Sequence, residues 1–423
     1  MNYYYIYNSF LNLIKMIIKY YNNNKISKII KIIIILIGIF ILIFLLNLYS
    51  YKNNKNNTIF NNKIDDLKEI QNFININING NLINPNEILH NINYPKISVI
   101  ITVYNGQGYL KPALRSIQNQ DFKDIEIIII DDCSKDDSLN LIRNLKKEDP
   151  RIRLIQNKKN KGILYSKTKG ILNAKGKYLL ILDMDDIYTA KDAFSTLYEE
   201  AERNNLDILG FASICNKDAN IMDKHLRIVF NLETPIIYKP NVSEWMYFHD
   251  ENGQVIRRGG ILWCYFFKTK LFIKVIKRIK KKFLIRKINI KEDLMFFFIL
   301  TRTAKNIKQI KRIFHFYFTK HESNDPKIIY SNKEKSKRRK YDCLGNLSYI
   351  EFLLTYTKNN IYDKEIASTE LKNFVLSYPC RNNTLMRKNS FKICKLFLKN
   401  KYININIKKD IILFLNEFKN KNR

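Results

Sequence analysis

The sequence predicts an α/β fold in which a mostly parallel sheet carries helices on both faces. Along residues 97–182, strand-like runs of isoleucine, valine and leucine alternate with segments whose apolar residues recur at helical spacing. The apolar runs are continuous, which is typical of strands buried on both faces of a parallel sheet. Each run also ends in polar residues, and ligands of such sheets bind where the carboxyl ends of the strands meet.

Four strands and three helices are expected in this region, in strict alternation. The predicted strands are Ile97–Thr102, Ile125–Ile130, Arg151–Ile155 and Tyr178–Leu182, and the helices between them are Tyr109–Asn119, Ser138–Lys147 and Leu164–Asn173. The alternation predicts parallel strands, so the polar residues that follow them should gather at the carboxyl edge of the sheet.

An acidic turn follows the fourth strand, where Asp183, Asp185 and Asp186 occur within one tetrapeptide. Carboxylates placed so closely repel one another unless a cation or a network of donors compensates them. We therefore expect a divalent cation that holds a phosphate. The alternative is a turn whose last carboxylates cap the next helix, just as Ser134 or Asp137 could cap the helix after the second strand.

Residues 97–188 resemble the nucleotide-binding half of the inverting family-two glycosyltransferases, which have the GT-A fold. The matching segments, in family order, are Ser98–Asn105, Ile130–Ser134, Asn160–Gly162 followed by Lys167 and Gly170, and Leu182–Asp186. Each segment alone is weak, and the four in order are strong. The sequence has Thr102, Cys133 and Lys167 where the family usually has proline, glycine and arginine, and a lysine lacks the planar bidentate donor of arginine.

The resemblance implies a set of donor-binding residues, namely Thr102, Tyr104, Asn105, Asp131, Asp132, Lys167, Asp183 and His321. In this set Tyr104 borders the base, and one of Asp131 and Asp132 accepts a hydrogen bond from uracil. Asp183 faces the ribose. Asp185, helped by Asp186, holds a Mn²⁺ or Mg²⁺ ion that bridges the diphosphate and neutralises the charge of the leaving group.

Glu292 and Asp293 resemble the downstream acidic pair of the family, which opens a helix beneath the acceptor site. Asp293 is the candidate general base, and the adjacent Glu292 would raise its pKa. The alternative is that the pair merely favours the positive end of a helix dipole. Two further residues have equally open interpretations: His321 either reaches the diphosphate or is a surface histidine, and Trp263 either borders the acceptor or is a core tryptophan.

Residues 29–49 are predicted to form a single transmembrane anchor. Ile32–Leu48 contains no charged residue and approaches the ~20 residues that span a bilayer. Lysines precede this segment without acidic residues, which predicts a cytosolic N-terminus and a catalytic part in the lumen of the Golgi or endoplasmic reticulum. The expected organisation is a tail over 1–28, the anchor over 29–49, a flexible stem over 50–94, a glycosyltransferase domain over 95–330 and a helical region over 331–423.

The formal net charge of +34 does not predict a nucleic-acid partner. The lysines are spread along the chain, and neither zinc-ligand spacing nor interleaved aromatic residues accompany them. Lysine, asparagine and isoleucine also share A/T-rich codons, so a biased genome would produce much of this composition.

The predicted function is metal-dependent, inverting transfer of a hexose or N-acetylhexosamine from a nucleotide diphosphate sugar, UDP-linked by expectation, to a hydroxyl of a glycan, protein or lipid. One alternative is a catalytically degenerate module of the same fold that binds nucleotide or glycan without turnover. An anchored basic scaffold is disfavoured because it has no use for acidic clusters at successive strand ends. A nucleotidyltransferase would more typically show a glycine-rich basic loop after the first strand.

Overall fold

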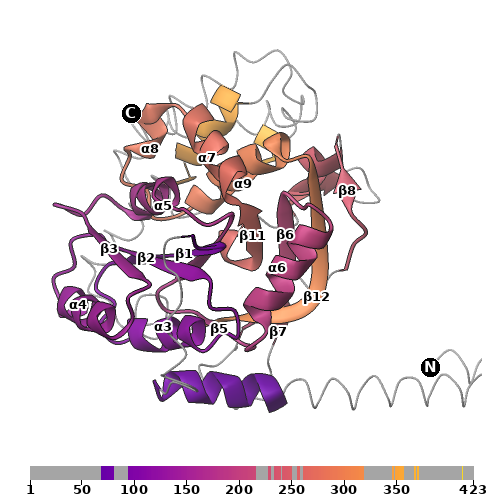
Figure 1. Cartoon of the computed structure of the whole chain (residues 1–423). Helices are drawn as coiled ribbons and strands as arrows, with labels where there is room; N and C mark the ends of the chain where they lie inside the picture. Colours follow the sequence, from indigo (N-terminus) through magenta and orange to yellow (C-terminus); the bar gives the residue numbers. More distant parts are fainter. Residues whose placement is uncertain are drawn as a thin grey trace, which may run out of the picture. The chain divides into compact units, whose positions relative to one another are not determined.

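The fold is a mixed α/β structure, seen in a computed structural model (Figure 1). The structure describes residues 68–80, 94–215, 227–229, 233–239, 241–249, 255–257, 261–318, 345–346, 348–356, 366–367, 369–370 and 412. The chain divides into Met1–Glu69 and Ile70–Arg423, and the elements described below belong to the second unit.

The first half alternates strands and helices as the sequence predicts. In chain order the elements are β1 (Ile97–Val103), α3 (Leu110–Gln118), β2 (Ile125–Asp131), α4 (Ser138–Glu148), β3 (Ile152–Gln156), α5 (Ile163–Leu172) and β4 (Tyr178–Asp183). Each boundary lies within one residue of the predicted one. The strands pair in parallel in the order β3-β2-β1-β4, so their carboxyl ends share one edge of the sheet.

The second half extends the same sheet with strands of both directions. Its elements are β5 (Ile187–Tyr188), α6 (Ala193–Arg203), β6 (Ile208–Cys215), β7 (Arg227–Val229), β8 (Ile237–Tyr238), η2 (Asn241–Glu244), β9 (Tyr247–His249), β10 (Val255–Arg257), η3 (Leu262–Cys264), β11 (Tyr265–Lys268), α7 (Thr269–Arg278), α8 (Lys281–Leu284), α9 (Glu292–Thr303) and β12 (Asn306–Tyr317). The sheet continues beyond β4 in the order β11-β6-β12-β5.

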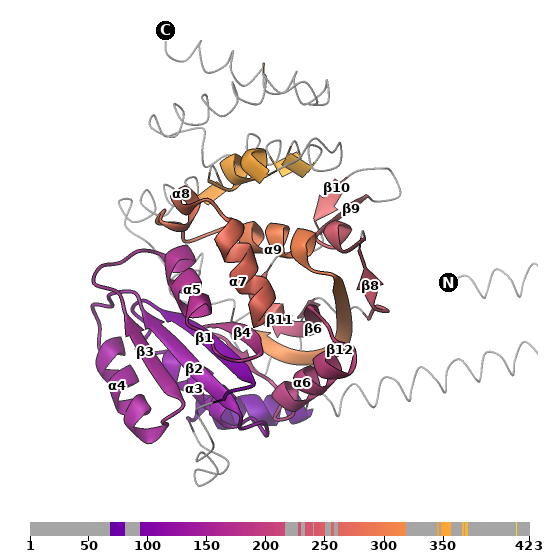
Figure 2. The same ribbon diagram turned by 45° about the horizontal axis from the view of Figure 1, so that its top comes forward.

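The antiparallel strand β11 makes the sheet mixed rather than uniformly parallel. It lies between β4 and β6 and pairs antiparallel with both. The long strand β12 pairs in parallel with β6, with register shifts between Gln309 and His315, and its other edge pairs antiparallel with β5 at His315 and Phe316. It bends visibly around the edge of the sheet in Figures 1 and 2. The prediction of a mostly parallel sheet is therefore correct for β1–β4, whereas the second half is mixed.

Helices cover both faces of the sheet, and each face has its own apolar core. The helices α3, α4 and α6 pack on one face with the odd-numbered residues of β1 and β2. The helices α5, α7 and α9 lie on the other face (Figures 1 and 2). They pack there with residues such as Ile100 and Ile128. The continuous isoleucine runs arise from this arrangement, because both faces of each strand are buried.

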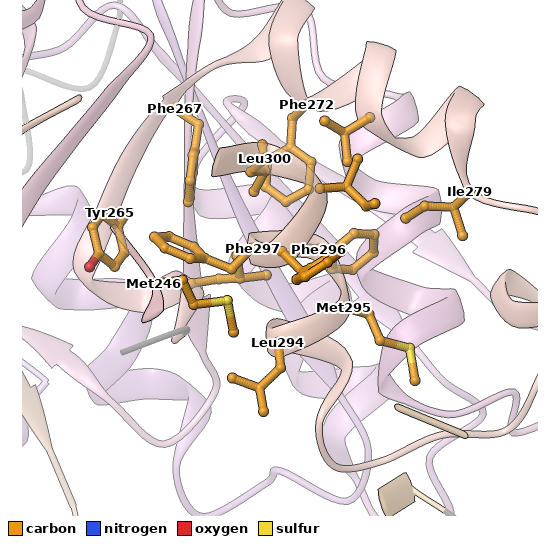
Figure 3. Packing of buried hydrophobic residues seen from close by; sticks show 14 of the residues in the cluster. Met246, Tyr265, Phe267, Phe272, Ile279, Leu294, Met295, Phe296, Phe297 and Leu300 are labelled. Carbon is orange, nitrogen blue, oxygen red and sulfur yellow. The ribbon is translucent and has the colours of Figure 1, made fainter. Parts of the chain in front are cut away.

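Helix α9 lies inside the second core, and every residue from Leu294 to Leu300 is buried. Its Phe297 ring lies 4.6 Å from the ring of Tyr265, and its Phe296 ring lies 5.3 Å from the ring of Phe272 (Figure 3). A helix that is apolar on all sides is stable only when it is enclosed. Its first turn, which carries Glu292 and Asp293, is therefore held rigidly.

Part of the predicted flexible stem is ordered. Residues 68–78 are helical. Ile70 and Ile74, four residues apart on one face, pack in a small cluster with Ile187, Ile214 and Phe316. Asn119 also donates a hydrogen bond to Asn77 across 2.7 Å. Ile70, Phe73 and Ile74 form its buried apolar face, and the asparagine-rich composition around them hid this helix.

The described residues of the C-terminal region pack into the core on the α5, α7 and α9 face of the sheet. Tyr349, Phe352 and Leu353 are buried in the same cluster as Phe283 and Phe298. The Phe352 ring lies 5.3 Å from the ring of Phe283. This part of the region therefore covers the core.

The predicted anchor, residues 29–49, lies outside the described residues. Within the part of the chain that the structure describes, no helix has the length and apolar character needed to cross a bilayer.

Candidate active site

A cavity of about 430 Å³ opens at the carboxyl ends of β1 and β4. Predicted site residues from four separate segments line it, namely Thr102, Tyr104, Asp132, Asp183, Asp185 and Glu292. The parallel register brings Thr102 beside Asp183, because these two residues pair across β1 and β4. His321 lies outside the described residues.

Asn105 joins the loops that follow β1 and β2. Its backbone has a φ of 54°, and its N–H donates a hydrogen bond to the Ser134 hydroxyl across 3.1 Å. In return, the Lys135 N–H donates to the Asn105 side-chain oxygen across 2.8 Å. The neighbouring Tyr104, 40% exposed, is left available at the cavity wall.

Asp132 fixes the loop between β3 and α5. Its two carboxylate oxygens accept hydrogen bonds from the backbone N–H groups of Lys161 at 2.8 Å and Gly162 at 2.7 Å. Gly162 has a φ of +88°, and a Cβ there would lie 2.9 Å from the Asn289 side chain. Asp131 is fully buried, and its Oδ1 accepts a hydrogen bond from the Ser134 N–H across 3.2 Å.

The carboxylates of the acidic turn after β4 point in different directions. Asp183 and Asp185 line the cavity. Burial, together with the negative charge of Asp183, raises the pKa of Asp185 to about 7. Two acidic groups of this kind repel each other most when the cavity is free of cations.

Asp186 is fully buried beneath the turn, although the resemblance implied a metal ligand there. It accepts a hydrogen bond from the Phe318 N–H across 3.3 Å, and its other oxygen lies 3.2 Å from His315 Nε2. Burial raises the pKa of Asp186 well above its usual range, and it lowers the pKa of His315 to about 3. Burial thus disfavours the charged form of both groups, and their contact joins the turn to β12.

Trp263 belongs to the same buried layer. Its ring stacks on His315 with centroids 4.2 Å apart and on Tyr317 with centroids 5.5 Å apart. With 7% of its surface exposed, it is a core tryptophan behind the cavity wall. Tyr317 is the aromatic residue of this stack that lines the cavity.

Lys167, from α5, connects the acidic turn to the first turn of α9. Its Nζ lies 2.9 Å from Asp293 Oδ1, 3.1 Å from Glu292 Oε1 and 3.4 Å from Asp183 Oδ1. Burial alone would lower the pKa of Lys167, but the carboxylates of Asp183, Asp293 and Glu292 raise it well above its usual value. The lysine is therefore charged and directed at carboxylates.

Glu292 and Asp293 begin α9 after Lys291, whose φ of 67° lets the chain turn into the helix. The Asp293 side chain is 15% exposed and that of Glu292 is 7% exposed. Burial raises the pKa of Asp293 to about 6 against the opposing effect of Lys167. A carboxylate with such a pKa accepts a proton readily near neutral pH.

The sequence profile of the family described as glycosyl transferase family 2 matches residues 98–266. This stretch contains β1 to β4, the acidic turn and the start of β11. Residues 98–266 are thus similar to a family 2 glycosyltransferase domain. The remaining cavity residues, from α9 and β12, follow this domain in the chain and pack onto the same sheet.

Curated relatives match the glycosyltransferase domain. The GalNAc(5)-diNAcBac-PP-undecaprenol beta-1,3-glucosyltransferase of Campylobacter jejuni is 34% identical over 194 residues, which are 42% of this chain and 62% of the relative. The glycosyltransferase EpsJ of Bacillus subtilis is 31% identical over 179 residues, 42% of this chain and 49% of the relative. The chain thus spans about half to three fifths of the length of these two relatives.

A solved structure shares the fold of the glycosyltransferase domain and its surroundings. The crystal structure of S. aureus TarS residues 1–349 in complex with UDP-GlcNAc aligns with a TM-score of 0.51 and 15% sequence identity. The alignment covers 74% of this chain and 82% of TarS 1–349. This likeness shows a GT-A-like mixed α/β fold with a curled sheet, which confirms the fold class predicted for this half of the chain.

The donor atoms around Asp185 fit a divalent cation that arrives with a phosphate. Among the described residues, no group of three or more histidine, cysteine or acidic side chains is gathered as a complete metal cage. Mg²⁺ is usually held by one or two carboxylates plus substrate phosphates rather than by such a cage. Asp185 supplies one carboxylate at the cavity. Burial and the negative charge of Asp183 raise its pKa, and a bound cation would offset both effects.

Sequence reasoning did not identify several residues that line the cavity. They include Ser166, Lys287, Asn289 and Tyr317. Lys287 and Asn289 belong to the loop before α9, which meets the first turn of α5 where the Leu164 N–H donates to the Ile288 carbonyl across 3.3 Å. The signal that could have found them is their position just before the Glu292–Asp293 pair.

Proposed function

We propose that this chain transfers a sugar from a nucleotide diphosphate sugar, UDP-linked, to a hydroxyl of a glycan, protein or lipid acceptor, with inversion at the anomeric carbon. One observation carries the proposal. A single cavity joins the acidic turn after β4 to the first turn of α9, where a carboxylate with a raised pKa lies beside the cavity residue Glu292. Inverting transfer needs both features, one for the leaving diphosphate and one for the acceptor proton.

The donor binds along the carboxyl edge of β1 and β4 in this proposal. Tyr104 borders the base, and Asp132 holds the loop at Gly162 in place beside the nucleotide. Asp183 faces the ribose. Asp185 holds the Mn²⁺ or Mg²⁺ ion, which when bound neutralises the charge that develops on the diphosphate. Asp186 supports this turn from beneath through its contact with Phe318.

Asp293 takes the proton of the acceptor hydroxyl as that hydroxyl attacks the anomeric carbon from the face opposite the diphosphate. A raised pKa and partial burial suit this step, because a partly desolvated carboxylate is a stronger base. Glu292, which is more buried, serves as its charged neighbour. The bond from the sugar to the diphosphate breaks as the new glycosidic bond forms, and the proton remains on Asp293.

The comparisons indicate which donors to test first. The Campylobacter relative is named as a glucosyltransferase acting on a polyprenyl-linked glycan, and the crystal structure of TarS contains UDP-GlcNAc. UDP-glucose and UDP-GlcNAc therefore come first, with UDP-galactose, UDP-GalNAc and GDP-mannose alongside. Lipid-linked glycans join free glycans and proteins as acceptors.

The testing experiment measures release of the nucleotide diphosphate by the purified chain for each donor, first with Mn²⁺ and then with excess chelator. Metal-dependent release from one donor, lost in Asp185→Asn, supports the proposal and names the sugar. Calorimetry on the same samples measures UDP binding. Tight UDP binding without release under any acceptor would replace the proposal with the alternative of a module that binds nucleotide without turnover.

We also propose that residues 29–49 anchor the chain in a Golgi or endoplasmic reticulum membrane, with the N-terminus in the cytosol. The support is the sequence alone, namely an uncharged apolar segment preceded by lysines. Protease added outside sealed microsomes should remove an N-terminal tag and leave a C-terminal tag intact. The opposite protection pattern would show the reverse orientation. Extraction of the chain by carbonate would contradict a transmembrane anchor.

A further inference from the structure

Lys167 is a buried cation enclosed by carboxylates from two other elements. Its side chain is 2% exposed, and its ammonium lies within 3.4 Å of oxygens of Asp183, Glu292 and Asp293. An ammonium has three N–H donors, so these three carboxylates match its donor capacity. A nucleotide that contacted Lys167 would have to displace one of them.

The geometry around Asp293 depends on this one cation. Lys167 from α5 contacts Oδ1 at 2.9 Å, and the Leu262 N–H, just before β11, contacts Oδ2 at 3.3 Å. Glu292 on the same helix adds a like charge, and Asp183 on β4 shares the lysine. These groups are the charged and polar neighbours of Asp293 among the described residues. Lys167 is the cation among them, and its charge offsets the negative charges of Glu292 and Asp183.

We propose that Lys167 is a positioning residue for Asp293 rather than a ligand of the nucleotide: it holds the carboxylate in place and keeps it ionised. The inference rests on the proposed function of Asp293 as general base. It differs from the nucleotide contact implied by resemblance at this position. A point-like ammonium is well suited to three convergent carboxylates, whereas a planar guanidinium is suited to one bidentate partner.

Removing the positive charge makes the Asp293 carboxylate harder to ionise. In Lys167→Met the acid limb of the pH profile of kcat should move up by about one pH unit, because the remaining neighbours of Asp293 are acidic. If the limb moves from about pH 6 to about pH 7, the kcat of the variant is about five- to tenfold below that of the wild type at pH 5 to 6. Above pH 8 the two kcat values should be nearly equal. The dissociation constant for UDP with Mn²⁺ should stay within about twofold.

Lys169→Met is the matched control, because it removes the same charge from the same helix. Lys169 contacts the Asn157 side-chain oxygen at 3.0 Å and no carboxylate of the cluster. Its pH profile should follow the wild type. Lys167→Arg keeps the charge, and it should restore the acid limb to within about half a pH unit of the wild type.

A tenfold or greater loss of UDP affinity in Lys167→Met, with the acid limb unmoved, would overturn the proposal and restore the nucleotide contact. Should Lys167→Met fail to fold, Lys167→Gln keeps N–H donors without the charge, and the same limb must move. Carbon-13 NMR of aspartate carboxyls, assigned through Asp293→Asn, follows the titration of Asp293 without any turnover. A wild type without turnover would refute the proposed function, whereas an unshifted Asp293 titration in Lys167→Gln would refute the role of Lys167.

Discussion

The pH dependence of turnover tests whether Asp293 is the general base. Burial raises the pKa of Asp293 to about 6, and a base works only in its ionised form. The ionised fraction is then about 90% at pH 7, half at pH 6 and about 10% at pH 5. We therefore expect kcat to fall about tenfold between pH 7 and pH 5.

The assay measures UDP release at saturating donor and Mn²⁺ in buffers from pH 4.5 to 9. Under saturation kcat reports groups in the bound complex, so the ionisation of Asp185 affects KM rather than kcat. Asp293→Asn should retain UDP binding within about threefold and lose at least about a hundredfold in kcat, since general-base catalysis contributes about 10²–10⁴-fold. Its residual activity should not vary between pH 5 and 7.

The companion variant is Glu292→Gln, which changes the neighbouring carboxylate that lines the cavity. It should lower kcat less than Asp293→Asn and shift the acid limb to lower pH, because a like charge is removed. The reasoning is refuted if Glu292→Gln loses the titrating limb while Asp293→Asn keeps it. In that case Glu292 is the base.

Three further predictions concern the metal, the cavity loop and the C-terminal region. Asp185 has a folded-state pKa of about 7, above its unfolded value, so the stability it contributes is present below pH 4 and is lost as pH rises through 7. Without metal, Asp185→Asn should therefore raise the free energy of unfolding at pH 8 by roughly 1–2 kcal/mol. Added Mn²⁺ should raise the Tm of the wild type and not that of Asp185→Asn. An equal rise of Tm in both proteins would contradict this. Gly162→Ala places a Cβ 2.9 Å from Asn289 at a φ of +88°, so it should lower the free energy of unfolding by about 1–3 kcal/mol and weaken UDP binding. Gly108→Ala, with nothing within 4 Å of its Cβ, is the control and should change neither quantity. Denaturation measures the first and calorimetry the second. Phe352→Ala should cost about 3–5 kcal/mol in a single urea transition, because the ring is fully buried against α8 and α9; a separate early transition would mean that the C-terminal region unfolds independently.

The first half of the fold was predictable because its signals are local. Each isoleucine run is a strand buried on both faces, and an unbroken apolar run is a signal that neighbouring residues carry by themselves. The acidic turn and the start of α9 were predictable for a similar reason, since each is a compact cluster of acidic residues that directly adjoins an apolar run, after β4 in one case and before Leu294 in the other.

The rest depended on contacts between distant residues. Strand β11 has four residues and no clear alternation, so its insertion between β4 and β6 had no local signal. Asp185 and Asp186 are adjacent and chemically identical, and contacts with His315 on β12 and with Phe318 just after it distinguish the buried Asp186. The partners of Lys167 on α9 follow it by 125 and 126 residues, so no spacing within α5 could reveal them.

The direction of β11 decides where the chain between β6 and η3 begins and ends. Because β11 runs against β4 and β6, the chain leaves β6 at Cys215 and re-enters at η3 on the same side of the sheet as the acidic turn. The described part between these two points is tied into the fold, because β8 pairs with the start of β12 and Trp245 lies in the core. Sequence changes next to Cys215 or Leu262 should therefore alter the surroundings of the acidic turn, whereas changes at β8 or Trp245 should alter stability.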